Sequence, residues 1–464
     1  MGTPFSLSQR LRARISTSRE WKMEAASPAS TQSRRNTSRK PSRRPAPPEA
    51  ITGTPAPEGE YAAPERWEET LELRGWTIRF DVSVEVPEAD RRPVLTLENA
   101  SFDAARCVEL TELFFGGPVE LRESQYSYDE ILEDLQYAQR GYFAGIDEET
   151  GEYIYGPYEG QKEDIAELKA LLAEAAGQED TFVPLAASGQ EFPFASRFVR
   201  ASDGRTGYLS CGGSNFSLGW RRYVLAQPER MVLQGESMPG ERPHLLENVK
   251  ITKEEAVAMG DAFLKRLGLE GFALAGAEKA RMVGTMVAEV MNEGYQLIYV
   301  QSVEGTLPFY YDELTEGRLL NGLLQDTDMM YGRSWLQEFL SLYVTEEGVL
   351  YFNWSRLKNT VNTASENAPL LPFEDIQQRV RDMLYLALPV YDAAEAEFGN
   401  EGDVRVERVL LTSALQQIPE QGDEVFLVPA WAIVLGMEHE LDAGLEPEVL
   451  LINALDGNYI NRWA

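Results

Sequence analysis

The sequence predicts an α+β protein in which antiparallel sheets are each covered by helices. Three observations support this class. Stretches of strictly alternating apolar and polar residues indicate half-buried strands. Apolar residues at helical spacing follow capping motifs, and short turns rich in Gly, Asn and Asp connect neighbouring elements. With 464 residues, 43% of them apolar and 25% charged, the chain is expected to fold into two or three packed units.

Residues 1–60 are rich in Ser, Arg, Thr and Pro and have neither helical nor strand periodicity. This composition predicts a disordered segment. Residues 1–50 hold eleven Lys and Arg against three Glu, a net charge of +8. Because the whole chain carries −32, the remaining 414 residues carry −40.

An acidic body of this kind repels nucleic acid and anionic lipid, because both require clustered Lys and Arg. We therefore expect no nucleic-acid partner, and nothing in the body extends the positive charge of the first fifty residues. No apolar run approaches the roughly 20 residues that span a bilayer, so no transmembrane span is expected.

Residues 61–245 are predicted to form an N-terminal α+β domain. Residues 77–86 alternate strictly, and Arg74-Gly75 predicts a hairpin turn before them. Ser101 is expected to cap a helix that runs to Phe115 and ends at Gly116. Two further helices are predicted, one opened by a capping box at Ser127 and Glu130 and one ended by Gly177.

A helix followed by a hairpin occurs twice in the C-terminal half, about 120 residues apart. This recurrence predicts a duplicated unit, with copies at residues 246–360 and 361–464. Thr252 and Glu255 form a capping box at the start of the first copy. The predicted hairpin turns are at residues 292–294 and 346–348 in the first copy, and at residues 421–423 and 456–457 in the second.

These helix-plus-hairpin copies, with a closing strand of the form Val428-Pro429-Ala430-Trp431 and the final residues Leu451-Ile452-Asn453-Ala454-Leu455-Asp456-Gly457, resemble the PepSY-like fold. The chain also resembles the extracytoplasmic YycH/YycI-type regulators of a cell-wall histidine kinase. It looks closer still to an uncharacterised family of bacterial lipoproteins, through its entry at residues 64–67 and the strand ending in Val86-Pro87. The resemblance covers residues 61–464.

The resemblance implies an extracytoplasmic, cell-surface location. It also implies an envelope protein or extracellular ligand as the partner. Lipoproteins of this pattern begin with a signal and a lipidated Cys, and the first fifty residues contain neither an apolar stretch nor a Cys. One hypothesis is that the Arg-, Ser- and Pro-rich beginning is a mis-called start; a lipid anchor is expected only in that case.

The sequence predicts no catalytic residue, metal site or cofactor. His244 lies in a Pro- and Gly-rich linker and His439 in an expected loop, Glu438-His439-Glu440, without the spacing that hydrolases or zinc sites require. The two cysteines, Cys107 and Cys211, are too few for a metal site, and whether they pair is left open.

One stretch is a candidate binding surface. It contains five aromatic side chains that can stack on sugars or anchor a peptide, although packing in a hairpin explains them as well. They are Tyr142, Phe143, Tyr153, Tyr155 and Tyr158.

The sequence favours a non-enzymatic extracytoplasmic binding or regulatory protein that acts through protein or ligand contacts. The alternative is a carboxylate-dependent, carbohydrate-active hydrolase with a cleft between the two halves. That alternative remains open, because among 75 Asp and Glu some must lie near one another.

Overall fold

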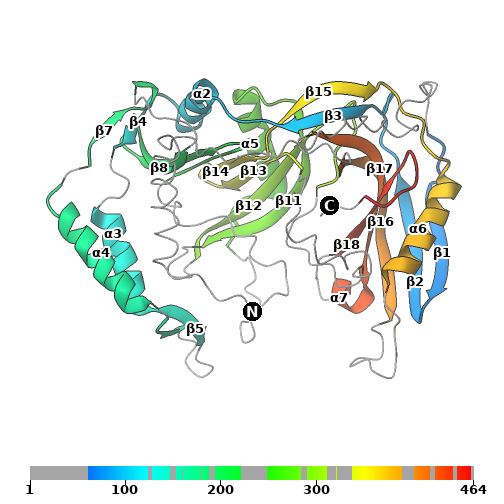
Figure 1. Ribbon diagram of the computed structural model, residues 1–464, viewed down its shortest axis with the longest axis horizontal. Helices are drawn as coiled ribbons and strands as arrows, with labels where there is room; N and C mark the ends of the chain where they lie inside the picture. The colour runs from blue at the N-terminus through cyan, green and yellow to red at the C-terminus, as the bar shows by residue number, and fades with distance from the viewer. Residues whose placement is uncertain are drawn as a thin grey trace, which may run out of the picture. The chain divides into compact units, whose positions relative to one another are not determined.

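The computed structural model describes thirteen stretches of the chain (Figure 1). They are residues 61–123, 128–146, 153–158, 160–178, 180–187, 194–220, 248–283, 290–310, 320, 337–388, 402–417, 424–442 and 447–460. Contacts divide the chain into two compact units. Among the described residues, the smaller unit covers 120–184 and the larger unit the remainder. The predicted disordered segment, residues 1–60, lies outside the described residues.

The first sheet of the larger unit combines strands from both ends of the described chain. Its strands are β1 (Arg66–Leu73), β2 (Trp76–Glu85), β3 (Val94–Asn99), β15 (Lys358–Ser365), β16 (Asp403–Gln417), β17 (Glu424–Met437) and β18 (Glu448–Asn453). They are ordered β1-β2-β16-β17-β3-β15, with β18 paired to β17. Only β2 and β16 run parallel; the other pairs are antiparallel.

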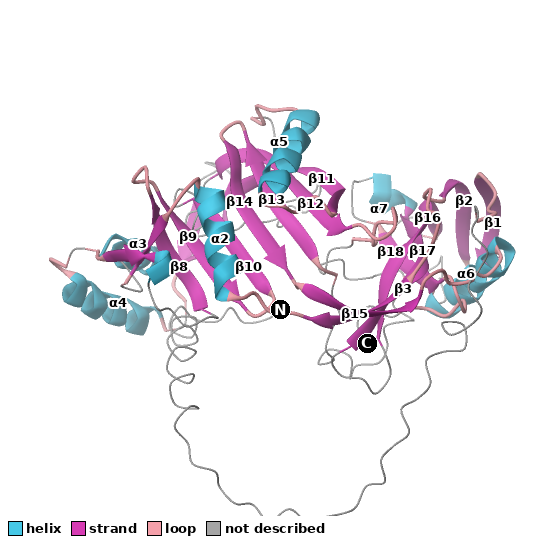
Figure 2. Ribbon diagram, turned by 90° about the horizontal axis from the view of Figure 1, so that it is seen from above, coloured by secondary structure: helices cyan, strands magenta, loops and turns pink. Residues whose placement is uncertain are grey.

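The second sheet of the larger unit is antiparallel throughout. Its strands are β8 (Phe194–Ala201), β9 (Thr206–Gly212), β10 (Asn215–Trp220), β11 (Phe272–Val283), β12 (Val290–Gln301), β13 (Phe339–Thr345) and β14 (Gly348–Ser355). Within this unit the order is β11-β12-β13-β14-β10-β9-β8. Figure 2 shows the helices α2 (Ala104–Phe115) and α5 (Lys253–Arg266) lying across this sheet. The predicted α+β class with helix-covered antiparallel sheets is confirmed.

The smaller unit is built around two helices. α3 (Tyr128–Arg140) and α4 (Gln161–Ala175) pack through the buried side chains of Ile131, Leu135, Ala138 and Leu168. Two short antiparallel pairs accompany them: β4 (Val119–Arg122) with β7 (Phe182–Pro184), and β5 (Tyr142–Ile146) with β6 (Tyr153–Gly156). The 3₁₀ turn η1 (Leu185–Ala187), which follows β7 in the sequence, belongs to the larger unit.

The main core lies between the first sheet and α6 (Phe373–Ala387). Alternation along β2 buries one face of the strand, and Phe80 of that face stacks on Trp67 with ring centroids 4.1 Å apart. α6 contributes Ile376, Val380 and Leu384, which recur at helical spacing and are fully buried. The apolar face of the strand and the apolar face of the helix therefore pack together in one core.

The duplicated order of elements is present in the structure. α5 is followed by the β11–β12 hairpin, and α6 by the β16–β17 hairpin. The capping box at Thr252 and Glu255 is formed, with both reciprocal hydrogen bonds. The turn at residues 346–348 joins β13 to β14, and Gly348 and Gly457 both adopt positive φ. The predicted turn at residues 421–423 lies outside the described residues.

The turn predicted at residues 292–294 is wrong. Asn292 and Gly294 lie inside β12, paired with Met282 and Ala280 of β11. A side chain on Gly294 would collide with the carbonyl oxygen of Val344 on β13. Glycine is needed there because two strand backbones approach closely. From the sequence alone, a glycine with this role cannot be distinguished from a glycine in a turn.

The cap of α2 also differs from the expectation. The helix begins after Asp103, whose side chain accepts a hydrogen bond from the backbone N–H of Arg106 at 2.7 Å. Ser101, the predicted cap, lies two residues earlier and is exposed. Both residue types cap helices equally well, so composition could not choose between them.

This geometry makes a testable distinction between the two residues. Asp103→Ala should lower the free energy of unfolding by about 1 kcal/mol, because it leaves the first turn of α2 without its acceptor. Ser101→Ala should change it by less than about 0.5 kcal/mol. Urea denaturation followed by circular dichroism measures both. A larger loss in Ser101→Ala than in Asp103→Ala would contradict the cap assignment.

Candidate functional site

The five aromatic residues predicted as a binding surface all lie in the smaller unit. Tyr142 and Phe143 are on β5, Tyr153 and Tyr155 on β6, and Tyr158 follows that strand. The strand register places Phe143 opposite Tyr155, and Tyr153 opposite Ile146. The hairpin therefore brings together two of the five positions directly, Phe143 and Tyr155.

Tyr155 and Tyr158 are half-buried and make contacts within their own unit. The guanidinium of Arg140 lies over the ring of Tyr155, 5.3 Å from its centroid, and the hydroxyl of Tyr158 donates to Asp164 Oδ2 at 3.0 Å. These contacts join the hairpin to α3 and α4. The side chains of Tyr142, Phe143 and Tyr153 lie outside the described part of the structure, and the binding role of the five residues stays a prediction.

Buried carboxylates are the next candidates, because a desolvated acid can serve as a general acid or base. The described residues contain four, and each accepts a hydrogen bond. The donors are the Tyr158 hydroxyl to Asp164, the Asn248 backbone N–H to Glu293 at 2.6 Å, the Trp354 indole N–H to Glu338 at 2.7 Å, and the Leu320 backbone N–H to Glu448 at 2.8 Å. All four thus tie separate segments of the chain together.

Glu338 is a buried carboxylate with a strongly shifted pKa. It precedes β13, is 4% exposed, and packs where the chain passes from β14 to β15. Desolvation raises the pKa of its carboxyl from 4.5 to about 7, against the lowering effects of the Trp354 hydrogen bond and the charge of Lys358. Desolvation likewise lowers the pKa of the Lys358 ammonium from 10.5 to about 8. The two groups therefore change charge close to neutral pH.

The surroundings of Glu338 are those of a structural anchor. Trp354, its hydrogen-bond donor, packs edge-on against the rings of Phe102 and Phe272. The ammonium of Lys358 donates a hydrogen bond to Asn99 Oδ1 at 2.8 Å, which connects β15 to β3. The sequence analysis did not single out Glu338, Trp354 or Lys358. The predicted turn at residues 346–348 already implies that Leu340 faces Trp354, as observed, which brings Glu338 within reach of the indole.

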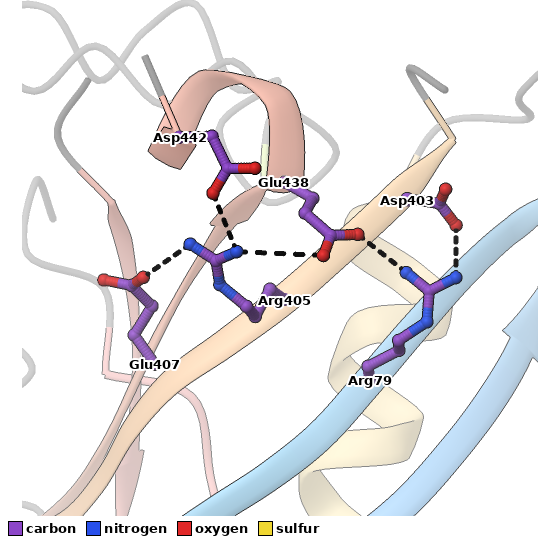
Figure 3. A network of polar contacts seen from close by, with 6 residues as sticks. All are labelled: Arg79, Asp403, Arg405, Glu407, Glu438 and Asp442. Atoms are coloured by element: carbon purple, nitrogen blue, oxygen red, sulfur yellow. Dashed lines mark hydrogen bonds and ion pairs between the residues drawn. The ribbon is translucent and has the colours of Figure 1, made fainter. Parts of the chain in front are cut away.

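An exposed ion-pair network joins β2, β16 and the short helix α7 (Glu438–Asp442) (Figure 3). Arg79 and Arg405 are directly opposite in the parallel β2–β16 pair. Glu438 lies between their guanidinium groups, 2.8 Å from that of Arg79 and 3.7 Å from that of Arg405. Asp403 adds a contact to Arg79, and Glu407 and Asp442 add contacts to Arg405. The carboxylates offset the repulsion between the two paired arginines.

This network includes Glu438, the first residue of the sequence Glu438-His439-Glu440. The sequence analysis expected these three residues to lie in a loop, but they lie in α7. Glu438 directs its carboxylate at the two arginines. No group of three or more His, Cys, Asp or Glu side chains in the described stretches has an arrangement that would hold a metal ion. His244 lies outside the described residues.

β15 is the most exposed strand of the first sheet. It ends the strand order and, among the described elements, pairs only with β3. Residues 359–363 are all exposed, so both faces of the strand meet solvent. They include Val361, whose residue surface is 43% exposed. Two register shifts against β3, around Val361 and Ala364, bend the strand. The sequence analysis did not predict this strand.

Comparisons with known proteins show only distant similarities. No family model matches the chain, and no curated protein matches it. An uncharacterised protein from Eubacterium rectale is similar over 83% of this chain and 90% of its own, with 10% sequence identity and a TM-score of 0.40. The C-terminal domain of Bacillus megaterium YpeB is similar over 57% of this chain and 80% of its own, with 11% identity and a TM-score of 0.26.

Among the described residues, no helix combines the length and the apolar character that crossing a membrane requires.

Proposed function

We propose that this chain is a non-enzymatic, extracytoplasmic binding or regulatory protein that acts through contact with a protein partner. The observation that carries the proposal is β15, an eight-residue strand at the edge of the first sheet with five consecutive exposed residues. An edge strand has backbone N–H and C=O groups available on one side, and an extended segment of another protein can pair with them.

The composition of β15 suits strand addition. Edge strands are usually protected by charged side chains, proline or bulges. After Lys358, residues 359–365 are Asn-Thr-Val-Asn-Thr-Ala-Ser and contain neither a charge nor a proline. The two bulges curve the strand, so a partner segment has to follow that curve. Asn and Thr side chains on both faces can add hydrogen bonds to the backbone pairing.

Charge indicates the kind of segment that β15 would accept. The uncharged residues 359–365 belong to a body that carries a formal charge of −40 over residues 51–464. Such a field attracts cationic partners and raises their rate of association. The partner is thus an envelope protein with an extended segment that is neutral in its centre and basic at its flanks.

The extracytoplasmic location and the assignment of two PepSY-like units belong to the same proposal. Their support is the sequence resemblance together with the repeated order α5-β11-β12 and α6-β16-β17. A hydrolase would require a carboxyl group that its substrate can reach. Glu338, whose pKa burial raises to about 7, is 4% exposed and accepts a hydrogen bond from Trp354, so this carboxyl does not meet that requirement.

Immobilising the full chain and passing a bacterial envelope extract over it tests the proposal. The wild-type chain should retain a basic protein saturably, and Val361→Lys should weaken that retention at least about tenfold, because a charge on the bulge of an edge strand opposes strand addition. Bound proteins are identified by mass spectrometry, and the affinity of the purified partner is then measured by calorimetry.

Leu386→Lys is the matched control, because Leu386 is also an exposed aliphatic residue, 58% exposed, but lies on α6. It should bind as the wild type does. Val361→Glu separates two effects: weakening by both Lys and Glu indicates strand blocking, whereas weakening by Lys alone indicates charge. Equal retention by Val361→Lys and the wild type would rule out β15, and no saturable partner would rule out the binding role.

A further inference from the structure

Two cysteines that are far apart in the sequence meet inside the larger unit. Cys107 on α2 and Cys211 on β9 are separated by 104 positions, and their Sγ atoms lie 2.7 Å apart. Both side chains are buried, with exposures of 0% and 1%. Each thiol is free, and each is the other's hydrogen-bond partner.

Contacts between the segments that flank the two cysteines fix their relative position. The backbone N–H of Phe102, just before α2, donates to the carbonyl oxygen of Gly213 at 3.0 Å, in the turn that follows β9. The ring of Phe102 packs on Phe216, which is the residue opposite Cys211 in the β9–β10 pair. The start of α2 is therefore fixed over the end of β9, so the two sulfur atoms are already placed for a bond and little chain entropy remains to be lost.

The two thiols differ in acidity. The hydrogen bond with Cys107 lowers the pKa of Cys211. The same hydrogen bond, together with burial, raises the pKa of Cys107. Cys211 is therefore the sulfur that forms a thiolate first and attacks an oxidant, because thiolates and not thiols carry out exchange.

We propose that Cys107 and Cys211 form an intramolecular disulfide that fastens α2 to the second sheet. The oxidant is a small-molecule disulfide. The Cys211 thiolate attacks one of its sulfur atoms, forms a mixed disulfide and releases one thiol. Cys107 then loses its proton and attacks Cys211 Sγ, which releases the second thiol. Two protein thiols are oxidised, and one small disulfide is reduced to two thiols.

The position of the bond gives it a specific role. The loop that it closes contains residues 120–184, the described part of the smaller unit. Cross-linking at the two ends of this insertion stabilises the larger unit by restricting its unfolded chain, and long loops gain most in that model. The proposal depends on the contact between the two sulfur atoms and is independent of the binding role of β15.

The test uses the full chain, unfolded in denaturant with a reductant and then refolded by dilution. One sample is refolded with oxidised and reduced glutathione, the other with excess reductant. The glutathione sample should lose two hydrogen atoms in mass, react with no thiol reagent in denaturant, and yield one linked peptide pair containing Cys107 and Cys211. Its equilibrium constant for unfolding in urea should be roughly 30- to 700-fold lower than that of the reduced sample.

Cys107→Ala provides the control, because its unfolding midpoint should not depend on the redox buffer. If that variant fails to fold, the comparison of the two wild-type samples is sufficient. Two free thiols in the folded glutathione sample, or disulfides between molecules, would overturn the proposal. A linked pair without any rise in the urea midpoint would overturn its stabilising role.

Discussion

Replacing Trp431 by alanine is expected to lower the free energy of unfolding by about 3–5 kcal/mol. Trp431 lies in β17, is fully buried, and is the largest side chain at that level of burial among the described residues. Its ring packs at 4.9 Å from that of Phe373, the first residue of α6, and at 5.9 Å from that of Tyr61. Truncation would leave a cavity where α6 meets the first sheet.

Urea denaturation followed by circular dichroism measures this loss. Tyr385→Ala is the matched control, since Tyr385 is an aromatic residue of α6 that is 51% exposed and contacts the guanidinium of Arg74. It should cost no more than about 1 kcal/mol. Similar losses in the two variants would show that Trp431 does not hold α6 to the sheet.

Replacing Glu338 by glutamine should stabilise the protein above neutral pH and have little effect at pH 4. The carboxyl has a pKa of about 7 in the folded chain and 4.5 as its ordinary value. The folded state therefore binds more protons than the unfolded state between these values, and stability falls as pH rises through that window. This difference in pKa corresponds to a loss of about 3 kcal/mol in the free energy of unfolding once the carboxyl is fully ionised. Glu338→Gln should avoid that loss, and its amide oxygen can still accept the hydrogen bond from Trp354.

The expected result is a stability difference between Glu338→Gln and wild type that grows from pH 4 to pH 8. Because the charge of Glu338 offsets part of the cost of a charged Lys358, about 3 kcal/mol is an upper bound. Glu366→Gln, at a side chain that is 71% exposed, should show no such dependence on pH. A constant difference between Glu338→Gln and wild type across this range would show that Glu338 titrates normally.

Local elements with a strong period were predictable from the sequence. The alternation in β2 and the helical spacing in α6 each bury one face, and each was recognisable because burial on one side leaves a pattern in the chain. The structural role of a residue was not predictable where its type fits two roles equally well. Gly294 resembled a turn residue, and Ser101 resembled a cap, until the neighbouring strand and Asp103 were known.

The candidate sites show the same division. The aromatic stretch around Tyr155 was visible because its residues are close in sequence. The Cys107–Cys211 contact and the Glu338–Lys358 group join positions on different elements. β15 was missed because both of its faces are exposed, so its sequence shows no alternation between apolar and polar residues.

The sequence by itself determined the class of fold, the strongly periodic elements such as β2 and α6, and the net negative charge, because these depend on neighbouring residues and on composition. Only the tertiary structure decided how the pieces join: β2 pairs in parallel with β16, and β3 lies between β17 and β15. Such pairings connect segments more than two hundred residues apart. The apolar pattern of a strand indicates which face is buried but not which strand lies beside it, since the backbone hydrogen bonds that join strands are alike for every residue.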